Sequence, residues 1–166
     1  MGSVHQLDPF PQPKRRVLIV EDNLDAVHTM ATLVRMMGHE VQFAINGFAA
    51  LDIARRFRPQ VILLDIGLPD FKGYNIARQL KWEPDLRNTR IIAITGRSMD
   101  EVRQKALEAG CEEVFAKPMD PTRLEEILVK HEGGKDARTR HRGKNARPTG
   151  GGQQRHAHDH GGDPAL

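Results

Sequence analysis

Short apolar runs alternate with longer segments of helical periodicity along the middle of the chain. Five runs rich in β-branched residues predict buried strands at residues 17–20, 41–45, 61–64, 91–95 and 114–116. Apolar residues spaced three and four apart predict five helices, with stripes at residues 24–34, 50–57, 76–80, 102–109 and 124–128. This alternation predicts an α/β fold, a doubly wound five-stranded parallel sheet whose faces are both covered by the five helices.

Residues that typically begin or end helices flank four of these stripes. Gly38 and Gly110 follow the first and the fourth stripe, where a glycine can end a helix. Pro59 stops the second stripe. Asp120 and Pro121 open the fifth as an N-cap and a first-turn residue. The helix boundaries are therefore expected close to these residues.

The two ends of the chain lack any such pattern. Residues 1–14 carry several prolines and predict a flexible N-terminal segment. Residues 132–166 are rich in Gly, Arg, His and Gln, and they bury too little apolar surface to offset the entropy lost on ordering. They predict a disordered basic, His-rich tail, which leaves residues 15–131 as the expected folded domain.

The composition excludes several classes of protein. Hydrophobic residues make up 39% of the chain, but the longest uninterrupted apolar runs are four residues, so no membrane span is expected. The N-terminus does not resemble a secretory signal, which predicts a cytoplasmic location. Cys111 is the only cysteine, so a disulfide framework and a paired-cysteine zinc site are excluded. We expect it to be a small residue at a helix end, and we expect His28 and His39 to be solvated.

The positive charge belongs to the tail. Residues 1–130 contain 18 Lys and Arg and 18 Asp and Glu, whereas residues 131–166 contain 7 basic and 4 acidic residues. The net charge of +3 therefore does not make the folded part a nucleic-acid binder, and no specific nucleic-acid partner is expected.

Polar residues lie at the carboxyl ends of four of the predicted strands. Glu21 and Asp22 come after the first strand, Asp65 after the third, Thr95 ends the fourth and Lys117 follows the last. The carboxyl ends of parallel strands share one edge of the sheet, so these side chains are expected to meet. Three carboxylates so close together repel one another strongly, so the site is unstable unless a cation joins them or one of them keeps a proton. Oxygen ligands favour a hard cation such as Mg²⁺. With a lysine and a hydroxyl nearby to contact an anion, the pattern indicates phosphoryl transfer onto an aspartate.

The chain resembles the receiver domain of bacterial two-component response regulators over about residues 15–131. The matching segments are residues 17–23 (Val-Leu-Ile-Val-Glu-Asp-Asn), 64–69 (Leu-Asp-Ile-Gly-Leu-Pro) with Gly73, 94–96 (Ile-Thr-Gly) and 115–118 (Phe-Ala-Lys-Pro). The 35 residues after His131 are too polar to form an output domain, so the resemblance is to the stand-alone, single-domain type, with a flavodoxin-like fold.

This resemblance implies that Asp65 accepts a phosphoryl group from a histidine kinase or a histidine phosphotransfer protein. It assigns Mg²⁺ to four ligands: Glu21, Asp22, Asp65 and the backbone carbonyl of Gly67. It implies that Thr95 and Lys117 contact the phosphoryl oxygens and that the peptide bond before Pro118 is cis. The chain would then be no enzyme for other substrates, because it would catalyse only its own phosphorylation and slow dephosphorylation.

Two departures from the family pattern affect these expectations. Val114 occupies the position of the aromatic switch residue, and Phe115 follows it, where strand alternation points it to the opposite face. Gly67 and Arg97 occupy the two positions that tune hydrolysis in the family, and Gly67 offers no side chain to orient a water molecule. We therefore expect slow self-dephosphorylation. The expected output surface is the face of the fourth helix, fifth strand and fifth helix, toward an unknown protein target.

Other functions remain open at this point. A haloacid-dehalogenase-type hydrolase also uses an aspartate at a strand end, but it needs a second aspartate where this chain has Gly67. A phosphorylation-independent interaction module would instead use the tail, in which alternating histidines could bind metal and basic residues an anionic partner. The sequence leaves open whether the chain forms a dimer.

Overall fold

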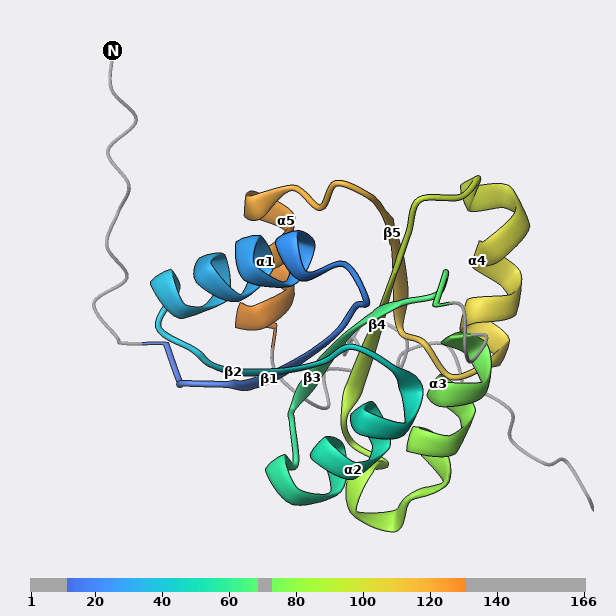
Figure 1. Cartoon of the computed structure of the whole chain (residues 1–166), viewed down its shortest axis with the longest axis horizontal. Helices are drawn as coiled ribbons and strands as arrows, with labels where there is room; N and C mark the ends of the chain where they lie inside the picture. Colours follow the sequence, from blue (N-terminus) through green and yellow to red (C-terminus); the bar gives the residue numbers. More distant parts are fainter. Residues whose placement is uncertain (1–11, 69–72, 131–166) are drawn as a thin grey trace, which may run out of the picture. The chain divides into compact units, whose positions relative to one another are not determined.

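The computed structural model describes residues 12–68 and 73–130, and in this part of the chain five parallel strands form one sheet (Figure 1). The strands are β1 (Arg16–Val20), β2 (Glu40–Ala44), β3 (Val61–Asp65), β4 (Arg90–Thr95) and β5 (Glu113–Ala116). The helices are α1 (Leu24–Met36), α2 (Gly47–Phe57), α3 (Gly73–Trp82), α4 (Met99–Glu108) and α5 (Pro121–Val129), with a short 3₁₀ helix at Pro84–Leu86. The strand order is β2-β1-β3-β4-β5, which confirms the predicted doubly wound α/β fold.

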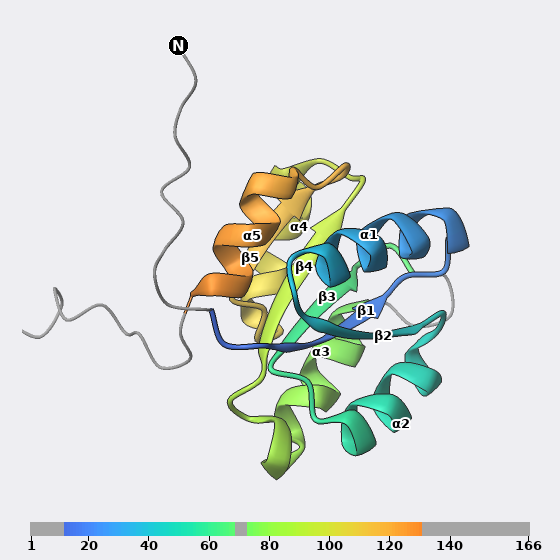
Figure 2. The same cartoon turned by 90° about the vertical axis from the view of Figure 1, so that its left-hand side faces the viewer.

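Helices cover both faces of the sheet (Figures 1 and 2), and an apolar layer lies on each face. On one face, the sheet packs against α1 and α5 through residues such as Val34 and Leu124. On the other face it packs against α2, α3 and α4, with Ile76 and Val102 in the core. Every residue of β3 and β4 is buried, which explains why these strands read as continuous apolar runs rather than as alternating patterns.

The predicted helix ends are confirmed. Gly38 and Gly110 follow α1 and α4 with φ of 89° and 101°, a left-handed conformation that glycine adopts without steric cost. Asp120 caps α5, since its carboxylate accepts from the backbone N–H groups of Thr122 and Arg123.

Three expectations need correction. Ile45 lies beyond β2 and is about half exposed, because β2 is an edge strand and the chain turns there into the cap of α2. Leu24 begins α1 but points largely to solvent rather than into its apolar stripe. His39 is buried instead of solvated: its Nδ1 accepts from the backbone N–H of Arg15 at 3.0 Å. Burial, together with the nearby Arg15, lowers the pKa of His39 and favours the neutral ring.

No helix within residues 12–68 and 73–130 has the length and apolar character needed to cross a membrane. The expectations about residues 1–11 and 131–166, including the basic, His-rich tail, lie outside the described residues.

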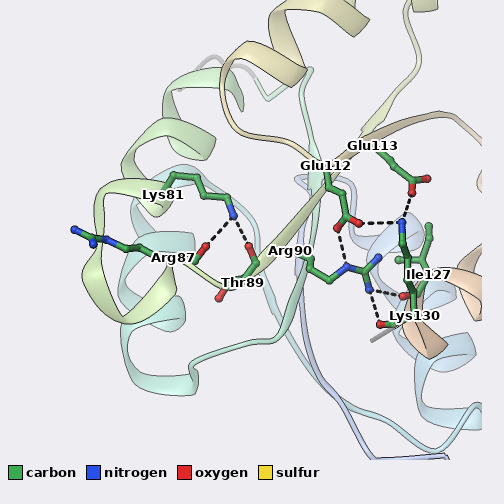
Figure 3. Close-up of polar contacts among 8 residues, drawn as sticks. All are labelled: Lys81, Arg87, Thr89, Arg90, Glu112, Glu113, Ile127 and Lys130. Atoms are coloured by element: carbon green, nitrogen blue, oxygen red, sulfur yellow. Dashed lines mark hydrogen bonds and ion pairs between the residues drawn. The ribbon is translucent and has the colours of Figure 1, made fainter. Parts of the chain in front are cut away.

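A polar network ties α5 to the amino-terminal edge of the sheet (Figure 3). The side chain of Arg90, at the start of β4, is buried and donates through Nε to Glu112 at 2.7 Å. Its Nη1 donates to the backbone carbonyls of Ile127 and Lys130 at the end of α5. The Lys130 ammonium in turn pairs with Glu112 and Glu113 at 3.1 and 3.2 Å. One buried guanidinium therefore satisfies helix carbonyls that would otherwise lack donors.

A second contact on the same edge fixes the turn before β4. The Lys81 ammonium, at the end of α3, donates to the carbonyl of Thr89 at 2.6 Å and to that of Arg87 at 3.3 Å (Figure 3). The Thr89 hydroxyl donates to the carbonyl of Pro59. Burial lowers the pKa of Lys81, and the hydrogen bonds to the two carbonyls stabilise its charged form.

The buried network predicts a large stability effect of Arg90. Replacing it, as in Arg90→Leu, removes one of the two cations that pair with Glu112 and leaves the buried carbonyl of Ile127 without its donor, so the free energy of unfolding in urea should fall by about 3 kcal/mol. The matched control is Arg123→Leu, which removes an exposed pair with Glu126 and should change stability by less than about 0.5 kcal/mol. Equal effects of the two substitutions would contradict the role assigned to Arg90.

Candidate functional site

Carboxylates from two neighbouring strands meet at the carboxyl edge of the sheet. The register pairs Val20 with Leu64, so the next residues, Glu21 and Asp65, leave the sheet at the same level. Carboxylate oxygens of Glu21, Asp22 and Asp65 lie within 4.8 Å of one another. Glu21 and Asp65 are buried, and Asp22 is exposed. Three hard oxygen ligands with one open side can hold a divalent cation such as Mg²⁺.

Lys117 reaches this cluster from β5, the edge strand next to β4. It follows β5, and its Nζ lies 2.6 Å from Glu21 Oε2 and 2.9 Å from Asp65 Oδ2. Burial alone would lower the pKa of Lys117, but the hydrogen bonds to Glu21 and Asp65 outweigh it and raise the pKa. The side chain is therefore a firmly protonated ammonium next to Asp65. The peptide bond between Lys117 and Pro118 is cis.

The charge balance of the cluster remains negative. Burial raises the pKa of Glu21, although Lys117 and the backbone N–H of Asn23 both stabilise its ionised form. One ammonium thus faces three carboxylates, and a cation placed among them would lower the electrostatic cost of keeping all three ionised. The side chain of Asn23 also caps the amino terminus of α1. This role was not predicted, although an Asn directly before a helical stripe is a typical N-cap.

The backbone after β3 holds Asp65 in one orientation. Its Oδ1 accepts from the N–H of Gly67 at 2.8 Å, while its Oδ2 faces Lys117. Gly73, at the start of α3, passes so close to this segment that a Cβ there would lie 2.6 Å from the Cα of Ile66. The close approach explains why a glycine occupies this position.

Thr95 ends β4 beside these residues. It is fully buried, and its Oγ1 accepts from the backbone N–H of Arg97 at 2.9 Å. Within the described residues, no hydrogen bond joins Thr95 to the carboxylates. Its hydroxyl proton thus remains free to be donated to a group that enters the site.

The two residues before Ala116 in β5 point to opposite faces. Val114 is buried in the layer of α2, α3 and α4, whereas Phe115 packs against the layer of α1 and α5.

Cys111, just before β5, is buried, and burial raises the pKa of its thiol to about 11. Its thiol is therefore protonated at neutral pH, which favours the structural role expected from the sequence.

The sequence profile of the response regulator receiver domain matches residues 17–129, which includes the whole site. The chain belongs to this family. The receiver is 34% identical over 119 residues to the polar-differentiation response regulator DivK of Brucella anthropi, covering 72% of this chain and 97% of DivK. Family membership also identifies it as a component of two-component signalling, and receivers are typically signalling modules rather than enzymes.

Solved receiver structures share the fold. The chemotaxis protein CheY4 of Vibrio cholerae superposes with a TM-score of 0.67 at 25% identity, covering 71% of this chain and all of CheY4. The receiver domain of a sensor histidine kinase from Pseudomonas aeruginosa PAO1 has a TM-score of 0.64 at 31% identity, covering 70% of this chain and 95% of that domain. That structure contains a magnesium ion coordinated in its active-site cleft, and the acidic cluster of this receiver matches such a site.

The close approach at Gly73 predicts a steric effect on the segment that positions Asp65. Gly73→Ala should lower the free energy of unfolding in urea by about 1–3 kcal/mol, because its Cβ meets backbone atoms that cannot rotate away. Gly96→Ala is the matched control, since nothing lies within 4 Å of a Cβ at that position. A destabilisation of Gly96→Ala as large as that of Gly73→Ala would show that the steric contact is not the cause.

Proposed function

We propose that this receiver is a phosphorylation-dependent signalling switch in which Asp65 accepts a phosphoryl group from a histidine kinase or a histidine phosphotransfer protein. The observation that supports it most directly is the Lys117 ammonium placed between Glu21 and Asp65, within a cluster of three carboxylates. If Asp65 had only a structural role, it would need neither the two neighbouring carboxylates nor the Lys117 ammonium. We propose the cytoplasm as its location.

The proposed metal ligands are the carboxylates of Glu21, Asp22 and Asp65 and the backbone carbonyl of Gly67. Their fit rests on the donor chemistry, since all four are oxygen ligands and the carboxylates lie within 4.8 Å of one another. When bound, Mg²⁺ would neutralise charge shared by the carboxylates and the phosphoryl oxygens.

The residues of the chain position both partners of the transfer. A carboxylate oxygen of Asp65 forms a bond to phosphorus while the bond from phosphorus to the donor imidazole nitrogen breaks, and the imidazole then takes a proton from water. The Lys117 ammonium, already 2.9 Å from Asp65, faces the charge on the phosphoryl oxygens. Thr95 donates its free hydroxyl proton to one of these oxygens. The transfer yields an aspartyl phosphate and no other product on the chain.

The change produced by phosphorylation is a change in partner binding. The face of α4, β5 and α5 remains the proposed output surface toward an unidentified protein. The family match and the acidic cluster favour this switch over the interaction module based on the tail, which lies outside the described residues.

Phosphorylation of Asp65 can be tested by intact-mass spectrometry after incubation with acetyl phosphate and Mg²⁺. We expect the mass of a single phosphoryl group to be added, and we expect Asp65→Asn or removal of Mg²⁺ with a chelator to abolish it. Asp25→Asn, an exposed acid in the first turn of α1 outside the cluster, should leave the adduct unchanged. An adduct that persists in Asp65→Asn would contradict the assignment of the acceptor.

The lifetime of the aspartyl phosphate tests the role of Gly67. With no side chain at this position to orient a water molecule, the phosphoryl group should persist for many minutes after the donor is removed. A time course of intact mass measures this, with the phosphorylated chain unfolded in urea as the reference for uncatalysed hydrolysis. A lifetime of seconds in the folded chain would contradict the expected slow self-dephosphorylation.

A further inference from the structure

A groove between α3 and α4 opens next to the acidic cluster. Its volume is about 1140 Å³, and Asp65 and Lys117 lie among its lining residues. Arg78 lines it from α3, Lys105 from α4 and Arg97 from the segment between β4 and α4. Figure 1 shows α3 and α4 next to each other, on the face of the sheet that they cover together with α2. The groove thus joins the proposed phosphorylation site to a surface between α3 and α4, which shares α4 with the face of α4, β5 and α5.

The groove carries an excess of positive charge. Among its described lining residues, the charged groups are four cations, Arg78, Arg97, Lys105 and Lys117, and two carboxylates, Asp65 and Glu101. Ion pairs within the described chain involve neither Arg97 nor Lys105, and Arg78 donates only to the neutral side chain of Asn75.

Three arginines on and after α2 are arranged differently. Arg55 and Arg56 on α2 pair with Glu83 and Asp52. Arg58, directly after α2, pairs with Asp85. These arginines are paired within the chain, whereas Arg78, Arg97 and Lys105 of the groove are available to an external anion.

Apolar surface lies alongside these cations. Leu68 and Val102 are buried residues that line the groove, and the half-buried ring of Tyr74 packs against the same core. A bound segment would therefore be partly shielded from water, which strengthens its ion pairs with the cations.

We propose that this groove docks an acidic segment of a partner protein and releases it when Asp65 is phosphorylated. The regulation rests on the proposed function of Asp65. Phosphorylation replaces the single negative charge of the Asp65 carboxylate by about −1.5 to −2 charges on the phosphoryl group, so it lowers the excess of two positive charges among the described lining residues by up to about one charge. The acidic segment therefore binds the unphosphorylated chain more tightly.

Binding of a fluorescein-labelled octaglutamate peptide to the full chain, followed by fluorescence anisotropy, tests the groove. The double substitution Arg97→Gln and Lys105→Gln should raise the Kd about fivefold or more. The matched control, Arg87→Gln with Arg103→Gln, removes two exposed cations that do not line the groove and should change the Kd less than about twofold. Equal losses in both double variants, no loss in either, or no binding of the peptide would overturn the proposal.

The same assay on the chain phosphorylated at Asp65 tests the regulation. We expect phosphorylation, verified by intact mass, to raise the Kd of the octaglutamate peptide about fivefold or more, and acetyl phosphate treatment of Asp65→Asn to leave the Kd unchanged. If the adduct forms but the Kd does not rise, the regulated groove is wrong and the phosphoacceptor stands. If no adduct forms on Asp65, the proposed function fails, and with it the phosphorylation dependence, whereas the comparison of the groove variants still decides peptide binding.

Discussion

The repulsion between carboxylates at the ends of β1 and β3 is the constraint on which the site depends. Both strands are buried among apolar side chains, and their register brings Glu21 and Asp65 to the same level of the sheet edge. A slip of one residue would move each side chain of these strands out of the apolar layer that it packs in and into the other one, so the strands cannot separate the two acids. Their charge must be offset from elsewhere, and Lys117 does so across the end of β4. The charge balance of the site therefore requires the half of the sheet from β3 to β5 to be complete.

The opposite edge of the sheet shows what a structural polar network looks like in the same fold. There Glu112 accepts from both Arg90 and Lys130, so its charge is matched by two cations. These partners lower the pKa of Glu112 even though burial works in the other direction. With Glu113, which also pairs with Lys130, that network has two carboxylates for two cations, whereas the carboxyl edge has three carboxylates for one ammonium and the pKa of Glu21 is raised. An unbalanced acidic cluster is electrostatically costly, which is why it points to binding rather than to stability.

The sequence predicted the fold and the composition of the site because both follow from local patterns. Apolar runs separated by helical stripes specify a parallel sheet, and a parallel sheet places the residues that follow its strands on one edge. The strand pattern alone therefore predicts that Glu21, Asp65 and Lys117 lie close together. The burial of His39 and the clamp made by Arg90 could not be predicted, because both depend on which backbone groups of distant segments lie nearby. The groove between α3 and α4 was missed for the same reason, since its cations come from separate elements.

The surroundings of Thr95 suggest where this receiver registers a phosphoryl group. Val114 is an aliphatic residue packed in the core, and Phe115 is held on the opposite face, so β5 offers no aromatic ring that could turn inward behind Thr95. What remains is the hydrogen bond from the N–H of Arg97 to the Thr95 hydroxyl, at the entrance to α4. In the proposed reaction, a phosphoryl group that accepts from Thr95 acts on this hydrogen bond and on the charge next to Arg97 at the same time. Both effects converge on the segment between β4 and α4, which links the carboxyl edge of the sheet to α4.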